Sequence, residues 1–401
     1  MKIAQKFHLT YCSNIHSGES WAEVSQNLHN YMPAIRQRLN WEGPFGIGLR
    51  LSARAAAELE NPQTLSAFQG FLAEQNFYVF TINGFPYGVF HKARVKEEVY
   101  LPDWMDEERL RYTNLLARIL ASLLPNDPRL QGSVSTVPGA FKQRIQSPEH
   151  VLRMAQNMLR HVAFLRELHQ QTGKTISLAL EAEPCCYMET VDEVLAFFRD
   201  YLFNPEVLER LAGELSVPLK ISDVRRHLGV CYDACHMAVE FEDPASAINR
   251  IKEAGISIYK FQISSALRVR FRAGDGRAAE VLAPFVEGIY LHQVVEKNRN
   301  ALRRFTDLPE GLSEEAAAGG GDEKEWRIHF HVPIFLDEMK NFSTTQDHLV
   351  SLLDLIKHNP VCPYLEVETY TWDVLPQEYR TLDVASAVAR ELAWVRNRIE
   401  S

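Results

Sequence analysis

Short apolar runs alternate along the chain with longer stretches of helical period, a pattern typical of repeated βα units. The apolar runs predict strands at 7–11, 45–51, 78–83, 133–136, 177–181, 228–233, 257–262 and 364–368. The periodic stretches predict helices at 21–39, 53–74, 106–124, 150–169, 191–201, 244–254, 347–357 and 385–399. This alternation predicts an α/β fold, a closed (β/α)₈ TIM barrel, formed as a single domain by residues 1–401.

The stretch between the seventh and eighth predicted strands is far longer than a single crossover helix requires. We expect residues 268–345 to form an insertion or lid within the barrel domain. Two apolar pieces in it, 288–293 and 327–333, can pair as extra strands. The Ala/Gly-rich tract 316–321 between them has the composition of a mobile linker.

Composition indicates a globular enzyme, because 46% of the residues are hydrophobic and 24% are charged. A net charge of -9 offers no overall attraction for a phosphate backbone, so the expected partner is a small-molecule metabolite and not nucleic acid. The first residues lack the pattern of a secretory signal, and no apolar run is long enough to span a bilayer. We therefore expect a cytoplasmic protein without membrane insertion, whose six cysteines are reduced.

Acidic residues stand at the carboxyl ends of three predicted strands, where α/β proteins place their chemistry. Asp233 ends the sixth strand, with His236 three residues later, while Glu181 and Glu368 end the fifth and eighth. A buried, unpaired carboxylate costs several kcal/mol, roughly, so each must be exposed, paired with Arg or Lys, or bound to metal. Their convergence predicts a site for a divalent ion such as Mn, Zn, Mg or Co, with Gln262 of the seventh strand as a further oxygen ligand.

Other residues near the predicted barrel mouth are candidates for contact with a substrate. Each has a structural alternative, such as a core histidine, ordinary loop packing or a salt bridge. The candidates are His16, Asn83, Phe85, Tyr87, Glu183, His292, His331 and Glu366. If 327–333 is a strand, His329 and His331 point the same way, and one of them can supply the ligand that Gln262 supplies poorly.

The run Gly-Val-Cys-Tyr-Asp-Ala-Cys-His at 229–236 resembles the Asp-x-Cys-His strand-six motif of the xylose isomerase-like barrel superfamily. That superfamily includes sugar isomerases, epimerases and endonuclease four, and the resemblance extends to 180–181 and 365–369. Segments 8–21, 83–88, 95–104 and 364–376 are similar to the EboE family, called metabolite traffic proteins, and the similarity runs the full chain. The resemblance implies that Glu181, Asp233, His236 and Glu368 are metal ligands or their immediate partners.

The chain also departs from these relatives. Endonuclease four holds three zinc ions with additional histidines from strands two and three, whereas these strands here end in Leu51-Ser52 and Asn83-Gly84. A trinuclear phosphodiesterase site is therefore not expected. Ketose epimerases take a histidine ligand from strand seven, where this chain has Gln262, so the fourth ligand stays open.

The leading hypothesis is a metal-dependent isomerase or epimerase for a small polyol, keto sugar, sugar phosphate or related metabolite, in a metabolite traffic or secondary-metabolite pathway. Glu181 and Glu368 would act as catalytic groups on opposite sides of the carbon that loses and regains its proton. Two alternatives remain: a metal-dependent hydrolase or lyase on the same site, and a protein that binds or delivers a metabolite without turning it over.

Overall fold

The structure is a computed structural model that describes residues 1–91, 94–213, 218–317, 321–339 and 341–401. Its strands are β1 (Lys2–Ile3), β2 (Phe7–Tyr11), β3 (Phe45–Arg50), β4 (Phe77–Asn83), β5 (Gly132–Thr136), β6 (Ile176–Glu181), β7 (Leu228–Asp233), β8 (Ile258–Ile263), β9 (Leu267–Arg272), β10 (Val294–Asn298), β11 (Ala301–Phe305), β12 (Glu323–Ile328), β13 (Ser343–Thr344) and β14 (Tyr364–Val367).

The helices include those that cover the barrel and two that belong to a second sheet. They are α1 (Trp21–Arg38), α2 (Ala53–Leu59), α3 (Pro62–Glu74), α4 (Glu107–Leu123), α5 (Pro148–Thr172), α6 (Val191–Phe197), α7 (Pro205–Ala212), α8 (Ile221–His227), α9 (Ala234–Val239), α10 (Pro244–Glu253), α11 (Arg277–Leu282), α12 (Leu308–Ala317), α13 (Gln346–His358) and α14 (Val384–Glu400). Among the described residues, no helix combines the length and the apolar character that a membrane span requires.

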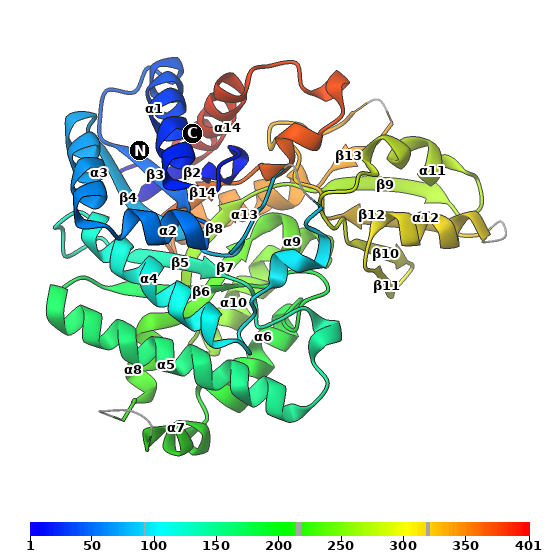
Figure 1. The fold of residues 1–401 in the computed structure, drawn as a ribbon. Coiled ribbons are helices and arrows are strands. Elements are labelled where there is room, and N and C mark those ends of the chain that lie inside the picture. The colour runs from blue at the N-terminus through cyan, green and yellow to red at the C-terminus, as the bar shows by residue number, and fades with distance from the viewer. Residues whose placement is uncertain (92–93, 214–217, 318–320, 340) are drawn as a thin grey trace.

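The main sheet is a mostly closed barrel with helices around it (Figure 1). Within the described residues its order is β1-β2-β14-β8-β7-β6-β5-β4-β3, and every neighbouring pair is parallel except the short β1-β2 hairpin. The barrel closes between β2 and β3. An isolated parallel bridge there joins Cys12, just after β2, to Gly48 of β3. The carboxyl ends of the parallel strands therefore surround one mouth.

The eight predicted barrel strands are confirmed within one residue at either end. One helix prediction was wrong, because the single helix expected at 53–74 is two helices. Pro62 starts α3, and the side chain of Asn61 caps it by accepting hydrogen bonds from the backbone of Gln63 and Thr64. A proline at the first turn and an Asx cap start a new helix, so the chain turns between α2 and α3.

The barrel interior holds a buried ion pair. Lys260 of β8 donates to Glu366 of β14 over 2.7 Å, and neither side chain is exposed to solvent. Lys260 also donates to the hydroxyl of Ser135 on β5, at 2.9 Å. Gly48 of β3 leaves room for this pair, because a Cβ at that position would lie 1.8 Å from Oε1 of Glu366.

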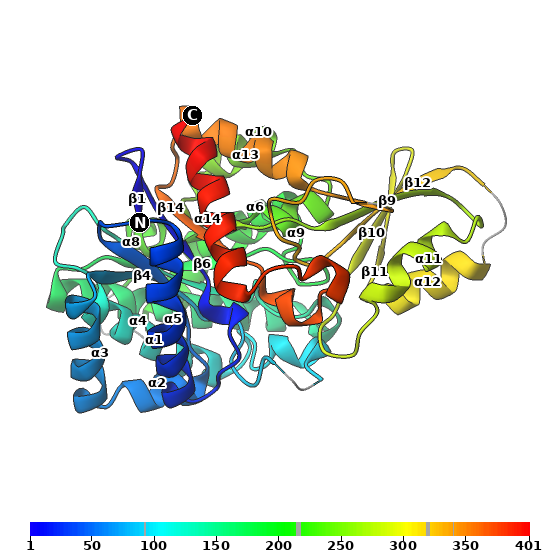
Figure 2. The same cartoon turned by 90° about the horizontal axis from the view of Figure 1, so that it is seen from above.

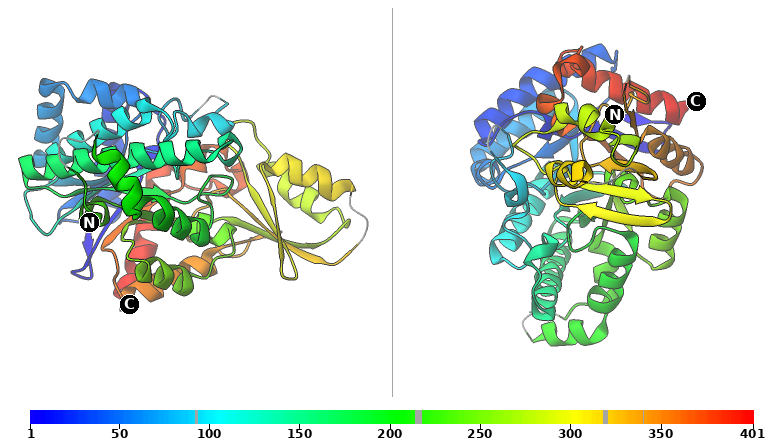
Figure 3. Two further views of the ribbon diagram at one scale, coloured as in Figure 1. Left: turned by 90° about the horizontal axis from the view of Figure 1, so that it is seen from below. Right: turned by 90° about the vertical axis from the view of Figure 1, so that its right-hand side faces the viewer.

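A second sheet lies in the chain between β8 and β14. Its order is β11-β10-β12-β9-β13, and its strands pair antiparallel. Figures 1 and 2 show it projecting from the barrel, with α11 and α12 along one face, and Figure 3 shows the same unit from below and from its outer end. Phe271, Trp326 and Phe330 belong to its own apolar core.

The predicted strands in this region were misplaced. Residues 288–293 are not a strand, and β12 stops at Ile328, so His329 and His331 lie in irregular chain beyond it. The pairing instead joins β10 to β12, with Val294 opposite Ile328. Of the tract expected to be a linker, residues 316–317 end α12, and 318–320 lie outside the described residues.

Candidate metal centre

A cavity opens at the carboxyl ends of the barrel strands, between the barrel loops and the chain segments next to β10 and β12. Its polar lining includes Glu181, His236 and Glu368 from the barrel and His329 from the chain after β12. The rest is largely apolar and aromatic. The complete lining is Asn14, Asn83, Phe85, Pro86, Phe90, Val95, Lys96, Val99, Tyr100, Glu181, Glu183, His236, Tyr290, Leu291, His329, Glu368 and Tyr370.

Three carboxylates from three strand ends converge at this mouth. Glu181 ends β6, Asp233 ends β7 and Glu368 follows β14 directly, and one oxygen of each lies within 4.8 Å of the others. All three side chains are buried. The sequence therefore placed these acids correctly, because strands that are parallel bring their carboxyl ends to one edge.

Asp233 is held by the start of α9. Its Oδ1 accepts hydrogen bonds from the backbone N–H of His236 at 3.0 Å and from Oγ of Ser264 at 2.8 Å, so the residue acts as the N-cap of the helix. Its other oxygen, Oδ2, is buried and has no hydrogen-bond partner among the described residues. The cap fixes the carboxylate and leaves one oxygen free for a ligand.

Glu368 is oriented by two amides from distant parts of the chain. Nδ2 of Asn14 and Nδ2 of Asn83 donate to its Oε1 at 2.7 and 2.9 Å. Glu181 has less support, since its Oε2 is buried and lacks a partner within the described part of the chain. Buried carboxylate oxygens of this kind are costly unless a donor or a cation satisfies them.

The electrostatics of the cluster favour a cation. Burial raises the pKa of Glu181 well above its usual range, and the nearby charges of Glu368 and Asp233 raise it further. Burial likewise raises the pKa of Glu368 to about 8, with additional contributions from Asp233 and Glu366. The Lys260 ammonium acts in the opposite direction but is already paired with Glu366. A divalent cation would neutralise the excess negative charge.

Three imidazoles lie beside the carboxylates, those of His236, His329 and His331. Nδ1 of His236 contacts the carbonyl oxygen of Ala182 at 3.0 Å, and Nδ1 of His331 contacts that of Glu368 at 2.9 Å. Because a carbonyl only accepts, each Nδ1 carries the proton. Nε2 of His331 is left buried without a partner in the described structure. Asp233, His236 and His331 also bring one atom each to within 4.8 Å of one another.

Gln262 is the further oxygen ligand that the sequence predicts. Gln262 lies in β8, in register with Asp233 on one side and Glu366 on the other, and is fully buried. Both polar side-chain atoms of Gln262, Oε1 and Nε2, are buried without a hydrogen-bond partner among the described residues. One ring nitrogen of His331 lies within 4.8 Å of a carboxylate oxygen of Asp233 and a ring nitrogen of His236.

The predicted substrate contacts divide into two sets. Asn83, Phe85 and Glu183 line the cavity, and Glu183 accepts a hydrogen bond from the hydroxyl of Tyr100 at 2.8 Å. His331 lies in the group with Asp233, whereas Glu366 is paired with Lys260 inside the barrel.

The remaining predicted contacts lie away from the cavity lining. His16 stacks on Tyr31, with ring centroids 4.0 Å apart. Tyr87 donates to Glu108 at 2.8 Å. The two ring nitrogens of His292 contact the carbonyl of His329 and the carboxylate of Glu287.

Some residues of the site were not identified from the sequence. Asn14 donates to Glu368, and Gln293 joins Tyr100, Glu183 and His329 in one hydrogen-bond network. Lys260 could have been identified from the sequence. It is a charged residue in an otherwise apolar strand, and it lies two positions before Gln262, so both side chains are on the same face of the strand. Asn14 and Gln293 give no such signal, since Asn14 lies in the short 3-10 helix Ser13–Ile15 and Gln293 in irregular chain before β10.

No family model and no curated protein matches the chain. Solved structures are similar to it over almost their whole length. One is a xylose isomerase-like TIM barrel protein from Mycobacterium smegmatis in complex with magnesium, at 12% identity and a TM-score of 0.49, covering 100% of this chain and 99% of that one.

Two further solved structures are similar. One is a D-tagatose 3-epimerase-like protein, at 10% identity and a TM-score of 0.49, covering 98% of each chain. The other is the IolI protein with a bound zinc atom, at 12% identity and a TM-score of 0.44, also covering 98% of each chain.

Proposed function

We propose that the protein is a metal-dependent isomerase or epimerase that acts on a small polyol, keto sugar or related metabolite. One observation carries the proposal: Glu181, Asp233 and Glu368 converge within 4.8 Å, and Glu181 and Asp233 each keep a buried oxygen without a partner among the described residues. Oxygen ligands of this kind suit Mg or Mn. A bound cation would polarise adjacent oxygens of the substrate.

The chain's own residues would then move the proton. Glu181 and Glu368 both line the cavity, so each carboxylate can reach a substrate bound there. Burial and neighbouring negative charge raise the pKa of both groups above the usual range, and a bound cation would act in the opposite direction, so burial and metal together would set the proton affinity of each carboxylate. Asn14 and Asn83 hold Glu368 in place for that transfer.

The residues that line the cavity favour an uncharged substrate with an apolar part. Phe85, Phe90, Val99, Tyr290 and Leu291 form much of the lining. Among the lining residues that the structure describes, the one lysine or arginine is Lys96. Its ammonium is already paired with Asp307 at 2.6 Å. A phosphate group would need to displace that partner, so an unphosphorylated metabolite fits the wall better.

The second sheet has a place in this proposal as a lid inserted in the barrel. Residues Tyr290, Leu291 and His329, all from the chain between β8 and β14, close one side of the cavity. The backbone N–H groups of Val95 and Lys96 both donate to the carbonyl of Ile289 at 2.8 Å, which ties this segment to the loop after β4. Such a cover would exclude water from an exchanging carbon.

Solvent exchange tests the proposal. The metal-reconstituted protein is incubated in D₂O with unphosphorylated keto pentoses and keto hexoses, and deuterium at the carbon beside the carbonyl is followed by NMR. Glu181→Gln should abolish exchange with the fold intact. Glu240→Gln is the matched control, because Glu240 is also a buried carboxylate but is paired with Arg304 outside the cavity lining. Equal exchange in the native protein and Glu181→Gln would contradict the assigned base.

The same experiment separates the two alternatives. Metal-dependent loss of water or release of a fragment from a substrate would favour a hydrolase or lyase. Tight binding of the ligand without deuterium entry would favour a protein that delivers a metabolite, which is the role that the resemblance to the EboE family implies.

A further inference from the structure

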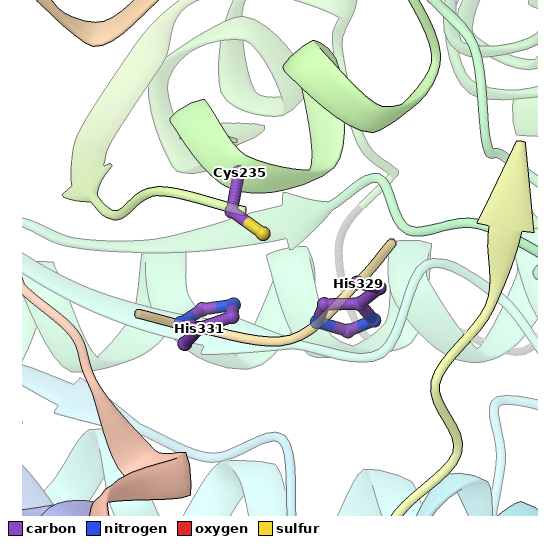
Figure 4. A group of neighbouring side chains, drawn as sticks. All are labelled: Cys235, His329 and His331. Atoms are coloured by element: carbon purple, nitrogen blue, oxygen red, sulfur yellow. The ribbon is translucent and has the colours of Figure 1, made fainter. Parts of the chain in front are cut away.

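A second group of metal-binding side chains adjoins the carboxylates. Cys235 in the first turn of α9 and His329 and His331 in the chain after β12 bring one ligand atom each to within 4.8 Å of one another. Figure 4 shows Sγ of Cys235 directed toward the two rings. All three residues are buried, with 0%, 4% and 0% of their surfaces exposed. The group is therefore enclosed in protein.

The hydrogen bonds of the imidazoles orient their second nitrogen toward this group. Nδ1 of His331 donates to the carbonyl of Glu368 at 2.9 Å. Nδ1 of His329 contacts Oε1 of Gln293 at 2.7 Å, and the amide nitrogen of Gln293 is used for Tyr100 and for the carbonyl of Pro184. Gln293 Oε1 is thus the acceptor. An imidazole that donates through Nδ1 to a carbonyl-type oxygen presents Nε2 as the metal ligand.

The second nitrogens have few protein donors among the described residues. Nε2 of His331 is buried with no hydrogen-bond partner in the described residues. Nε2 of His329 lies 3.4 Å from the hydroxyl of Tyr370 and only 3.0 Å from Nε2 of His236, although the Nδ1 of each ring already carries a proton. Two neutral rings with these tautomers would set one lone pair against another. A cation in this space removes that conflict.

We propose that Cys235, His329 and His331 form a second cation site, distinct from the Glu181/Asp233/Glu368 site and rich in nitrogen and sulfur ligands. A thiolate with two imidazoles selects a borderline or soft ion such as Zn²⁺ or Co²⁺, whereas three carboxylates select a harder one. His236 lies between the two groups, since it also belongs to the group with Asp233. Binding at Cys235 releases the thiol proton to solvent and forms the bond from sulfur to metal.

Cobalt reconstitution tests this site without a substrate. The full-length protein is stripped with a chelator and titrated with Co²⁺ alone, with bound metal counted by elemental analysis and absorption recorded from the near ultraviolet to the visible. The native protein should bind two equivalents and show a thiolate-to-cobalt charge-transfer band. Cys235→Ser should lose that band and one of the two equivalents. Cys362→Ser, a change at another buried cysteine, should keep both.

Further variants keep the two sites distinguishable. Glu181→Gln with Glu368→Gln should lose the other equivalent and retain the charge-transfer band. If Cys235→Ser folds poorly, His329→Ala provides a second test of the same site. With its fold checked by circular dichroism, this variant should also lose one equivalent of Co²⁺ and the charge-transfer band. A native protein whose bound Co²⁺ shows no charge-transfer band, or a Cys235→Ser spectrum identical to the native one, would overturn the second site. A native protein that binds a single equivalent and shows the band would overturn only the carboxylate site of the proposed catalytic metal.

Discussion

Nδ2 of Asn83, the last residue of β4, donates a hydrogen bond of 2.9 Å to Oε1 of Glu368, 285 residues later in the chain. The bond crosses the barrel mouth and links two strand ends that are not neighbours in the sheet. Asn14 donates to the same oxygen from the short 3-10 helix Ser13–Ile15 that follows β2, so two amides fix one carboxylate. The other oxygen of Glu368 is left for a cation or a substrate proton.

Replacing Asn83 should weaken metal binding. Asn83→Leu keeps the side-chain size but removes one donor, so the ionised form of Glu368 loses part of its support and a proton competes better with the metal. A hydrogen bond to a charged group is worth about 1.5–3 kcal/mol, so we expect roughly a tenfold or larger loss in affinity. Calorimetric titration with Mn²⁺ at pH 7 measures it. Thr81→Val, two residues earlier on β4, should bind metal as the native protein does.

Glu181→Gln should have opposite effects on stability with and without metal. In metal-free protein the substitution removes one of three clustered carboxylates, whose burial and mutual repulsion raise the pKa of Glu181, so the free energy of unfolding should increase. In metal-loaded protein the lost ligand should reduce the stabilisation, which is about 2.7 kcal/mol at a metal concentration 100 times the Kd. Thermal unfolding with a chelator and with added Mn²⁺ compares the two. A change of the same sign in both conditions would contradict the metal site.

Removing one partner of the ion pair between Lys260 and Glu366 should lower the free energy of unfolding. Lys260→Met leaves the carboxylate of Glu366 buried without its cation, and we expect a loss of about 3–5 kcal/mol in the free energy of unfolding. Adding Glu366→Gln to that variant should recover part of the loss, because the buried charge is then gone. Urea denaturation of both variants measures the difference. Equal stability of the single and double variants would show that the pair is not responsible.

Glu391 should make the protein less stable as the pH rises. Burial raises its pKa to about 7, while its side chain accepts hydrogen bonds from Thr369 and from the backbone of Ile334. The folded state therefore keeps a proton that the unfolded state releases, and this group's contribution is lost between about pH 4.5 and 7. A tenfold difference in proton affinity between the folded and unfolded states corresponds to about 1.4 kcal/mol.

Glu391→Gln removes that titration and keeps an oxygen that can accept the same bonds. Relative to the native protein, the variant should gain stability as the pH is raised from 5 to 8, measured by urea denaturation at each pH. The exposed Glu253→Gln serves as the control and should show no such trend. A difference between Glu391→Gln and native protein that does not change with pH would contradict the raised pKa.

The local pattern of apolar and polar residues was sufficient to predict the barrel strands and the three acids at their carboxyl ends. Apolar runs of strand length that stop at Glu181, Asp233 and Glu368 fix both the strand and the edge at which its last side chain lies, because parallel strands share that edge. The same reasoning failed at 53–74, where helical period continues across Asn61 and Pro62 although the chain turns there.

The partners of those acids depended on the tertiary structure. Strand ends define directions but not distances between loops, so the sequence did not reveal that Asn14 and Asn83 meet at Glu368 or that Lys260 neutralises Glu366. His329 and His331 were expected on a strand, yet they converge with Cys235 from irregular chain after β12. Periodicity carries no information about where such a segment lies, because only the packing of the second sheet against the barrel positions it.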